Sequence, residues 1–224
     1  MQEFIWLLPS FPLAGFLILV LTSGTLPRIT VAVIGAGSIG LSFLVASIIA
    51  VQFLGSGDDY YIKEVWTWMS VGGFSPGFSF YLDGLSLVMM LIITGVGFLI
   101  HLYATGYMAD DPSYSRFFSY MNLFIAAMLM LVLGDNLVLL YLGWEGVGLC
   151  SYLLIGFWYT KPENGYAARK AFVVTRVGDT SMAIGLFLLF AQLGTLNIQD
   201  MLHVAEVEWN IGSGLAIATT LLLL

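Results

Sequence analysis

One apolar stretch constrains this chain more than any other feature. Residues 135–159 read DNLVLLYLGWEGVGLCSYLLIGFWY and hold Glu145 near their middle. About 20 apolar residues cross the hydrocarbon core of a bilayer as a helix. A carboxyl group at the centre of such a helix costs at least about 2.5 kcal/mol on insertion scales. The stretch therefore predicts a membrane-spanning helix whose acidic residue has a functional reason to be there.

The composition extends this interpretation to the whole chain. Hydrophobic residues make up 59% of the sequence and charged residues only 9%, against about 25% charged residues in a soluble domain. The net charge of −7 argues against a nucleic-acid partner, which requires a basic face. A single cysteine, Cys150, excludes a disulfide framework and any iron–sulfur cluster held by the cysteines of this chain. We therefore expect an integral membrane protein whose redox centres, if any, lie on partners.

Seven apolar segments predict an all-α, polytopic transmembrane helix bundle that forms one domain over residues 1–224. Asp83 is expected to begin the third helix and Asp135 to cap the fifth. The seventh segment reaches residue 224 uncharged and unfinished, so we expect a truncated chain. The predicted spans are about 4–21, 29–54, 81–108, 115–133, 135–159, 166–193 and 211–224.

Two other patterns refine this architecture. Short alternating runs at 64–69 and 78–82, separated by glycines and Pro76, predict a small extramembrane hairpin. The GAGSIG sequence at 35–40 matches a dinucleotide-binding expression, but that motif requires a strand before it and a helix after it. Here the glycines lie inside a long apolar run. They predict close packing between helices.

The basic residues predict the orientation. In the seven-span arrangement Lys63 stands alone on one side, and Arg176 lies within the membrane. The positive-inside rule then places the N-terminus outside and the turn near Lys161 in the cytoplasm. The residues expected on the cytoplasmic side are Arg28, Arg116, Lys161, Arg169 and Lys170.

Charged side chains within the predicted spans are the candidates for function. Glu145 and Asp179 each lie roughly 20 Å along their helices from the turn at Lys161, so we expect them at similar depth. Arg176 and Asp179 are three residues apart and share a helix face, so they are expected to pair. This pairing leaves Glu145 without a partner on the first six spans. It is then either protonated or faces a cation on another segment.

A carboxylate whose proton affinity depends on a nearby cation is what a proton pump requires. We therefore take Glu145, Arg176, Asp179 and His101 as the candidate site residues, with no cofactor-binding or metal-binding residue. Structural alternatives remain for each of them. Glu145 could be a protonated acid bonded to a neighbouring helix. The Arg176–Asp179 pair could serve only to make an arginine tolerable in lipid, and His101 could be an interfacial histidine bonded to a carbonyl.

Two long motifs match a known family. GWEGVGLCSYLLIGFW at 143–158 and KAFVVTRVGD at 170–179 resemble the largest antiporter-like membrane subunit of respiratory complex I, NADH–quinone oxidoreductase. LDGLS at 82–86 and YSRFF at 114–118 are similar to the same family. The resemblance covers almost the whole chain and corresponds to the N-terminal part of that subunit.

The resemblance implies an antiporter-like fold of inverted repeats with discontinuous helices, of which this chain supplies the first half. It implies that Glu145 is the essential membrane acid, that Arg176 and Asp179 flank the channel, and that the partner lysine lies shortly after residue 224. The implied activity is proton translocation, as a subunit of a translocase driven by quinone chemistry. NADH, FMN, iron–sulfur clusters and quinone are expected on partner subunits, with no cofactor on this chain. The implied location is the bacterial inner membrane.

Rival functions of two classes remain open. The large subunit of a multisubunit sodium/proton antiporter shares the GWEG-type helix, and membrane hydrogenases or bicarbonate-uptake complexes use similar helices. A structural membrane subunit that does not pump is the alternative of another class. The acid at position 145 argues against the structural alternative, because a leucine there would make the helix more stable.

Overall fold

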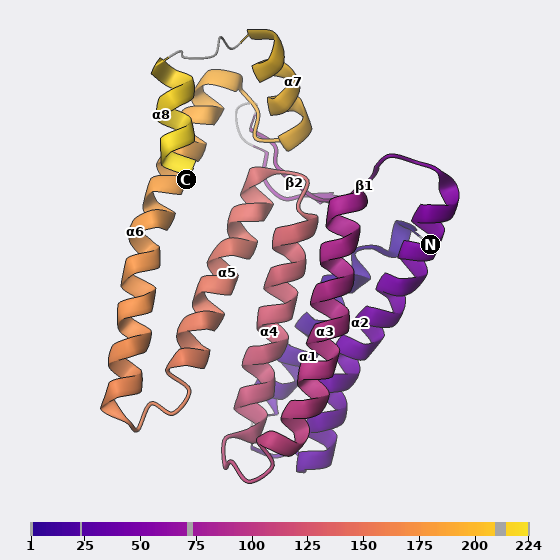
Figure 1. Ribbon diagram of the computed structural model, residues 1–224, viewed down its shortest axis with the longest axis vertical. Helices are drawn as coiled ribbons and strands as arrows, with labels where there is room; N and C mark the ends of the chain where they lie inside the picture. Colours follow the sequence, from indigo (N-terminus) through magenta and orange to yellow (C-terminus); the bar gives the residue numbers. More distant parts are fainter. Residues whose placement is uncertain (1, 23, 71–73, 209–213, 224) are drawn as a thin grey trace.

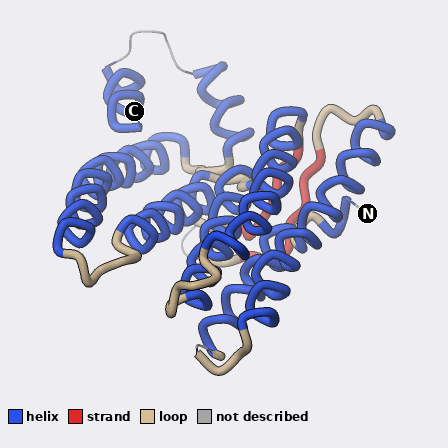
Figure 2. Tube along the Cα trace, turned by 60° about the horizontal axis from the view of Figure 1, so that its bottom comes forward, coloured by secondary structure: helices blue, strands red, loops and turns tan. Residues whose placement is uncertain are grey.

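The computed structural model describes residues 2–22, 24–70, 74–208 and 214–223. Helices predominate, and one two-stranded sheet lies among them (Figure 1; Figure 2). The elements are the 3₁₀ helix η1 (Gln2–Phe4), α1 (Leu7–Leu21), α2 (Arg28–Ser56), β1 (Tyr61–Thr67), β2 (Gly77–Leu82), α3 (Gly84–Tyr107), α4 (Tyr114–Leu133), α5 (Leu137–Ile155), α6 (Pro162–Leu193), α7 (Ile198–Glu208) and α8 (Gly214–Leu223).

Helix α4 is the centre of the bundle. It packs against α1, α2, α3 and α5, while α6 packs against α5 on one side and α8 on the other. The α5–α6 pair therefore stands at the edge of the bundle, joined by a short turn at the end opposite α7 (Figure 1). This arrangement puts the two helices that carry the predicted site residues side by side.

Glycines permit the closest helix contacts, as the sequence predicts. A methyl group on Gly35 would meet the Phe118 ring of α4, and one on Gly40 would meet the Phe98 ring of α3. The GAGSIG segment is thus a packing surface inside α2. Gly143 of α5 lies still closer to its neighbour, because a Cβ there would lie 2.5 Å from the Leu131 nitrogen of α4.

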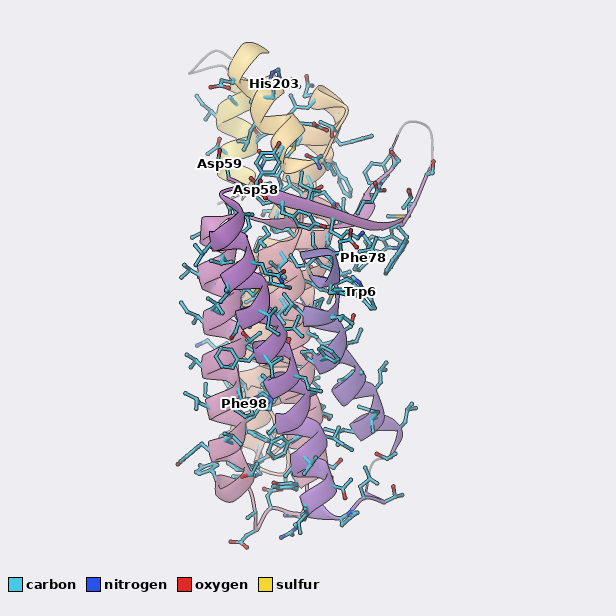
Figure 3. The ribbon with its side chains drawn as sticks, turned by 90° about the vertical axis from the view of Figure 1, so that its right-hand side faces the viewer. Trp6, Asp58, Asp59, Phe78, Phe98 and His203 are labelled. Carbon is cyan, nitrogen blue, oxygen red and sulfur yellow. The ribbon has the colours of Figure 1, made fainter. Side chains whose placement is uncertain are left out.

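The predicted hairpin is present as the antiparallel pair β1–β2, with an irregularity between Glu64 and Trp66. It crosses one end of the helices, where Figure 3 also shows Asp58, Asp59 and His203. The predicted third span starts too early, since Tyr81 pairs with Ile62 in the sheet and α3 begins at Gly84. Asp83 begins that helix as expected, since its carboxylate accepts a bond from the Ser86 backbone and the Ser86 hydroxyl accepts one from the Asp83 backbone.

Five helices, α2 to α6, are long and apolar enough to cross a membrane, and α1 is a shorter apolar helix of 15 residues. Their exposed surface is largely apolar, with Leu99, Val177 and Phe187 among the most exposed side chains. A surface of this kind requires a lipid environment or partner proteins. The chain is a multi-pass membrane protein. Residues 211–213 and 224 of the predicted seventh span lie outside the described residues. The rest of that predicted span corresponds to α8.

Candidate functional site: an ion cluster between α5 and α6

Glu145 and Arg176 form an ion pair that the sequence did not predict. The Arg176 guanidinium on α6 contacts the Glu145 carboxylate on α5, so Glu145 has a partner within the first six helices, and the expectation that it lacks one is wrong. The antiparallel α5 and α6 bring the two residues to the same depth. The residue count concerned the depth of Glu145 and Asp179, and the rotation of α6 about its axis, which aims Arg176 at α5, does not follow from a count.

Arg176 also lies close to Asp179 on its own helix. Its Nε is 3.6 Å from Asp179 Oδ2, which is an ion pair but longer than a hydrogen bond. The guanidinium rests on the Phe172 ring, 4.5 Å from its centroid, one turn earlier in α6. One arginine is therefore shared by two carboxylates and held by a cation–π contact.

The surroundings of Asp179 fix its orientation. The side chain is 7% exposed, compared with 24% for Glu145 and 30% for Arg176. Trp144 Nε1 donates a 2.8 Å hydrogen bond to Asp179 Oδ1, and the Tyr141 hydroxyl donates one of 3.3 Å to the Asp179 carbonyl. Because both donors come from α5, Asp179 is bound across the helix interface while Glu145 is the more accessible acid.

Small residues on α5 make room for this cluster. A Cβ on Gly148 would lie 3.2 Å from Arg176 Nη2, and one on Gly146 would lie 2.9 Å from the Ala127 Cβ of α4. Gly148 and Gly146 thus admit the arginine on one side and α4 on the other. The glycines on either side of Glu145 therefore permit the close approach of its neighbours.

His101 stands apart from the cluster. It is fully buried in α3, its Nδ1 lies 2.7 Å from the Gly97 carbonyl oxygen, and its ring packs against Phe118. Its Nε2 has no hydrogen-bond partner among the described residues. No described hydrogen bond or ion pair joins it to Glu145 or Arg176, so the structure brings three of the four predicted residues together.

Sequence reasoning missed three contributors to the site: Trp144, Tyr141 and Phe172. Two of them carried a signal that could have been read. Trp144 adjoins Glu145, and Phe172 precedes Arg176 by four residues, which places it on the same helix face. Tyr141 carried no such signal, because its partner is a backbone carbonyl on another helix.

Two segments of the chain match known protein families. Residues 68–118 match the family described as NADH-ubiquinone oxidoreductase (complex I), chain 5 N-terminus, and residues 134–224 match NADH:quinone oxidoreductase/Mrp antiporter, TM. The second match contains the whole ion cluster.

Whole-chain relatives carry related names. NADH-quinone oxidoreductase subunit L of Escherichia coli K12 is 55% identical over 213 residues, which is 95% of this chain and 35% of the relative. The subunit L of Pseudomonas aeruginosa is 55% identical over 216 residues, again 95% of this chain and 35% of the relative. This chain spans about a third of the length of these relatives.

A solved structure shares the fold. A chain of the membrane-bound sulfane sulfur reductase, an archaeal respiratory membrane complex, superposes with a TM-score of 0.83 at 18% identity, over 99% of this chain and 43% of that one. At that identity the likeness concerns the fold. From the sequence matches, the chain belongs to the family of antiporter-like membrane subunits of NADH:quinone oxidoreductases and Mrp antiporters.

Proposed function

We propose that this chain forms the opening part of a proton-translocating membrane subunit of an NADH:quinone oxidoreductase. Its relatives are named as subunit L of such enzymes. The proposal assigns NADH oxidation, flavin, iron–sulfur clusters and quinone chemistry to partner subunits. The present chain supplies proton-binding groups within the membrane.

The observation that carries the proposal is the sharing of Arg176 between Glu145 and Asp179. An arginine stays protonated in proteins, so its guanidinium does not itself carry the proton. It controls which carboxylate is stabilised as an anion. When Arg176 sits on Glu145, the Glu145 proton is released. When Arg176 turns towards Asp179, Glu145 loses its counter-ion and takes up a proton.

The geometry favours movement at Glu145 over movement at Asp179. Asp179 is held by Trp144 from α5, whereas no described hydrogen bond other than the contact with Arg176 holds the Glu145 carboxylate. A small displacement of the guanidinium, of the order of one side-chain rotamer change, would exchange its partners. Moving one charge against the membrane potential requires about 2.3 kcal/mol per 100 mV, and the proposal assigns that energy to the redox partners.

The distribution of charge supports an orientation with the N-terminus outside. The α3–α4 and α5–α6 connections lie at one end of the bundle, and the hairpin and α7 lie at the other (Figure 1). Lys161, Arg169 and Lys170 belong to the first end, and Asp58, Asp59 and Asp200 to the second. We assign the first end to the cytoplasm by the positive-inside rule, in a bacterial inner membrane.

The experiment that tests the proposal uses the full-length subunit in its assembled complex. NADH-driven proton uptake into vesicles is measured together with quinone reduction for the parent complex, Glu145→Gln and a matched control. The control is Glu163→Gln, which replaces an exposed acid in the first turn of α6. Assembly is checked in each case. We expect uptake and coupled turnover to fall in Glu145→Gln alone. Unchanged uptake in Glu145→Gln would refute the proposal and favour a structural subunit.

A sodium/proton antiporter subunit is the second candidate, because the family matched at residues 134–224 includes Mrp antiporters. The two candidates differ in energy source and partners. An assembled native complex that oxidises no NADH, but exchanges sodium for protons across the vesicle membrane, would establish the antiporter.

A further inference from the structure

A second buried acid lies at the outer end of the Glu145 helix. Asp135, in the connection between α4 and α5, is 5% exposed. Its Oδ2 accepts hydrogen bonds from Ser79 Oγ at 3.0 Å and Asn197 Nδ2 at 2.8 Å. Its Oδ1 is buried and has no hydrogen-bond partner among the described residues. It does not cap α5 as expected, because that role falls to Asn136, whose side chain accepts from the Leu139 nitrogen.

Backbone bonds hold this carboxyl group in place from two directions. The Asp135 nitrogen donates to the Ser79 carbonyl in β2, and the Asp135 carbonyl accepts from the Ile198 nitrogen at the start of α7. The residue is therefore fixed between the hairpin and the α6–α7 connection. A buried carboxyl oxygen in a fixed position needs a partner or a proton.

A pocket adjoins Asp135. It has a volume of about 300 Å³ and is lined by the hairpin, the end of α6 and the start of α7. At about 30 Å³ per water molecule, it holds roughly ten waters. Glu64 and Asp200 also line it, with the polar side chains of Ser79 and Asn197, and no lysine, arginine or histidine is among its described lining residues. The pocket is thus electronegative and suited to water and positive charge.

The surroundings raise the pKa of the Asp135 carboxyl group above its ordinary value. Burial is the largest cause, and the negative charges of Asp200 and Glu64 add to it, against the opposing hydrogen bonds from Ser79 and Asn197. Asp135 also lines a second cavity of about 340 Å³, together with Tyr81 and Asp83. These neighbours from β1, β2, α7 and the start of α3 provide no described cation that would hold Asp135 ionised.

Asp135 lies just before the start of α5, on the hairpin side of the ion cluster. Asp135 precedes Glu145 by ten residues, or about 15 Å along the helix. Tyr141 lies between them, and its hydroxyl group bonds to Asp179. The polar groups of the cluster therefore extend from Glu145 towards the end of α5 that carries Asp135 and the pocket.

We propose that Asp135 is a proton-exchange site that connects the α5–α6 ion cluster with water at the hairpin end of the protein. This inference rests on the proposed function. The Asp135 carboxylate accepts a proton arriving from the membrane interior and becomes a neutral carboxylic acid. It then gives that proton to a water molecule of the pocket, which regenerates the carboxylate and releases a hydronium ion to the outside.

The test compares Asp135→Asn with Asp58→Asn, an exposed acid at the same end of the bundle (Figure 3). Both are made in the full-length subunit of the assembled complex. Proton uptake into inverted vesicles, whose lumen meets the hairpin end, is measured over a series of lumenal pH values. We expect Asp135→Asn to lower uptake by at least about tenfold and to abolish its dependence on lumenal pH, while Asp58→Asn behaves as the parent. An unchanged rate and pH profile in Asp135→Asn would overturn the inference.

Two further variants keep the outcome decisive. If Asp135→Asn does not assemble, Asp135→Glu retains a titrating carboxyl group one methylene further out. A shifted lumenal pH profile in that variant supports the proposal, and an unshifted one overturns it. Glu145→Gln is measured in parallel. Full uptake in Glu145→Gln refutes the proposed function itself, whereas loss of uptake there with normal uptake in Asp135→Asn refutes only this inference.

Discussion

Replacing Gly143 by alanine should separate α4 from α5. A Cβ at this position would lie 2.5 Å from the Leu131 nitrogen, 2.7 Å from the Leu131 Cα and 2.9 Å from the Ala127 carbonyl oxygen. Unstrained heavy atoms rest at about 3.5–4.0 Å, so α5 must move by about 1 Å. All three contacts are backbone atoms of a helix, which cannot turn aside as a side chain can.

The expected cost follows from this geometry. Adding a methyl group to a filled contact typically costs about 1–3 kcal/mol, which corresponds to a roughly 5- to 160-fold fall in the folding equilibrium constant at 25 °C. Glu145 follows Gly143 by two residues, so the displacement also moves its carboxylate relative to Arg176. We therefore expect lower stability together with weaker NADH-driven proton uptake in the assembled complex.

Gly178→Ala is the matched control, because nothing lies within 4 Å of a Cβ placed on that α6 glycine. Alanine should be neutral or slightly stabilising there, since it is the better helix former. Denaturant unfolding of the purified full-length subunit, followed by circular dichroism, compares both variants with the parent. Equal stability of Gly143→Ala and Gly178→Ala would refute the close α4–α5 packing.

Three further predictions follow from the described contacts. A double-mutant cycle of Arg176→Gln and Glu145→Gln should give a coupling energy of about 1–2 kcal/mol in the free energy of unfolding. This is below the roughly 3–5 kcal/mol lost when a fully buried pair is broken, because the two side chains are 30% and 24% exposed. Strictly additive effects of the two substitutions would contradict the ion pair. Because the folded-state pKa of Asp135 is raised, the unfolded chain ionises first as pH rises from about 4, and stability falls until the folded carboxyl group has ionised as well. Asp135→Asn should thus exceed the parent in stability at alkaline pH and lose that advantage below about pH 4; a difference independent of pH would contradict the assignment. Asp83→Ala removes the capping box of α3 and should cost about 1 kcal/mol in denaturant unfolding; an unchanged midpoint would show that the cap contributes nothing.

The sequence predicted the all-α bundle and the hairpin because each is encoded by a one-dimensional pattern. Bilayer thickness sets the length of a spanning helix, and alternation marks a half-buried strand. The predicted third span wrongly included Tyr81, which lies in β2. Apolar content does not distinguish a strand residue from a helix residue, and the helix begins only after the capping box at Asp83. The Asp135 carboxylate is bonded to Ser79 and Asn197, so Asn136 caps α5 in its place, and contacts of such long range do not follow from the local sequence.

The ion cluster marks the limit of prediction from spacing, and that limit has a physical cause. A helix fixes the angle between Arg176 and Asp179, so their proximity followed from three residues of separation. The contact between Arg176 and Glu145 depends on how α6 is rotated against α5. Gly148 permits the contact, because its missing side chain leaves room for Arg176 Nη2.

The charge balance of the cluster explains how such a site can respond to events elsewhere. Two carboxylates share one guanidinium in the cluster between α5 and α6, so full ionisation of these three groups leaves one net negative charge there. That charge is costly in lipid and is relieved either by one proton or by one further cation. Proton and cation therefore compete to neutralise the same site. Any partner that moves a cation towards Glu145 expels its proton, and any partner that withdraws the cation draws a proton in. In the proposed function, this competition is what couples redox chemistry on other subunits to proton movement through this chain.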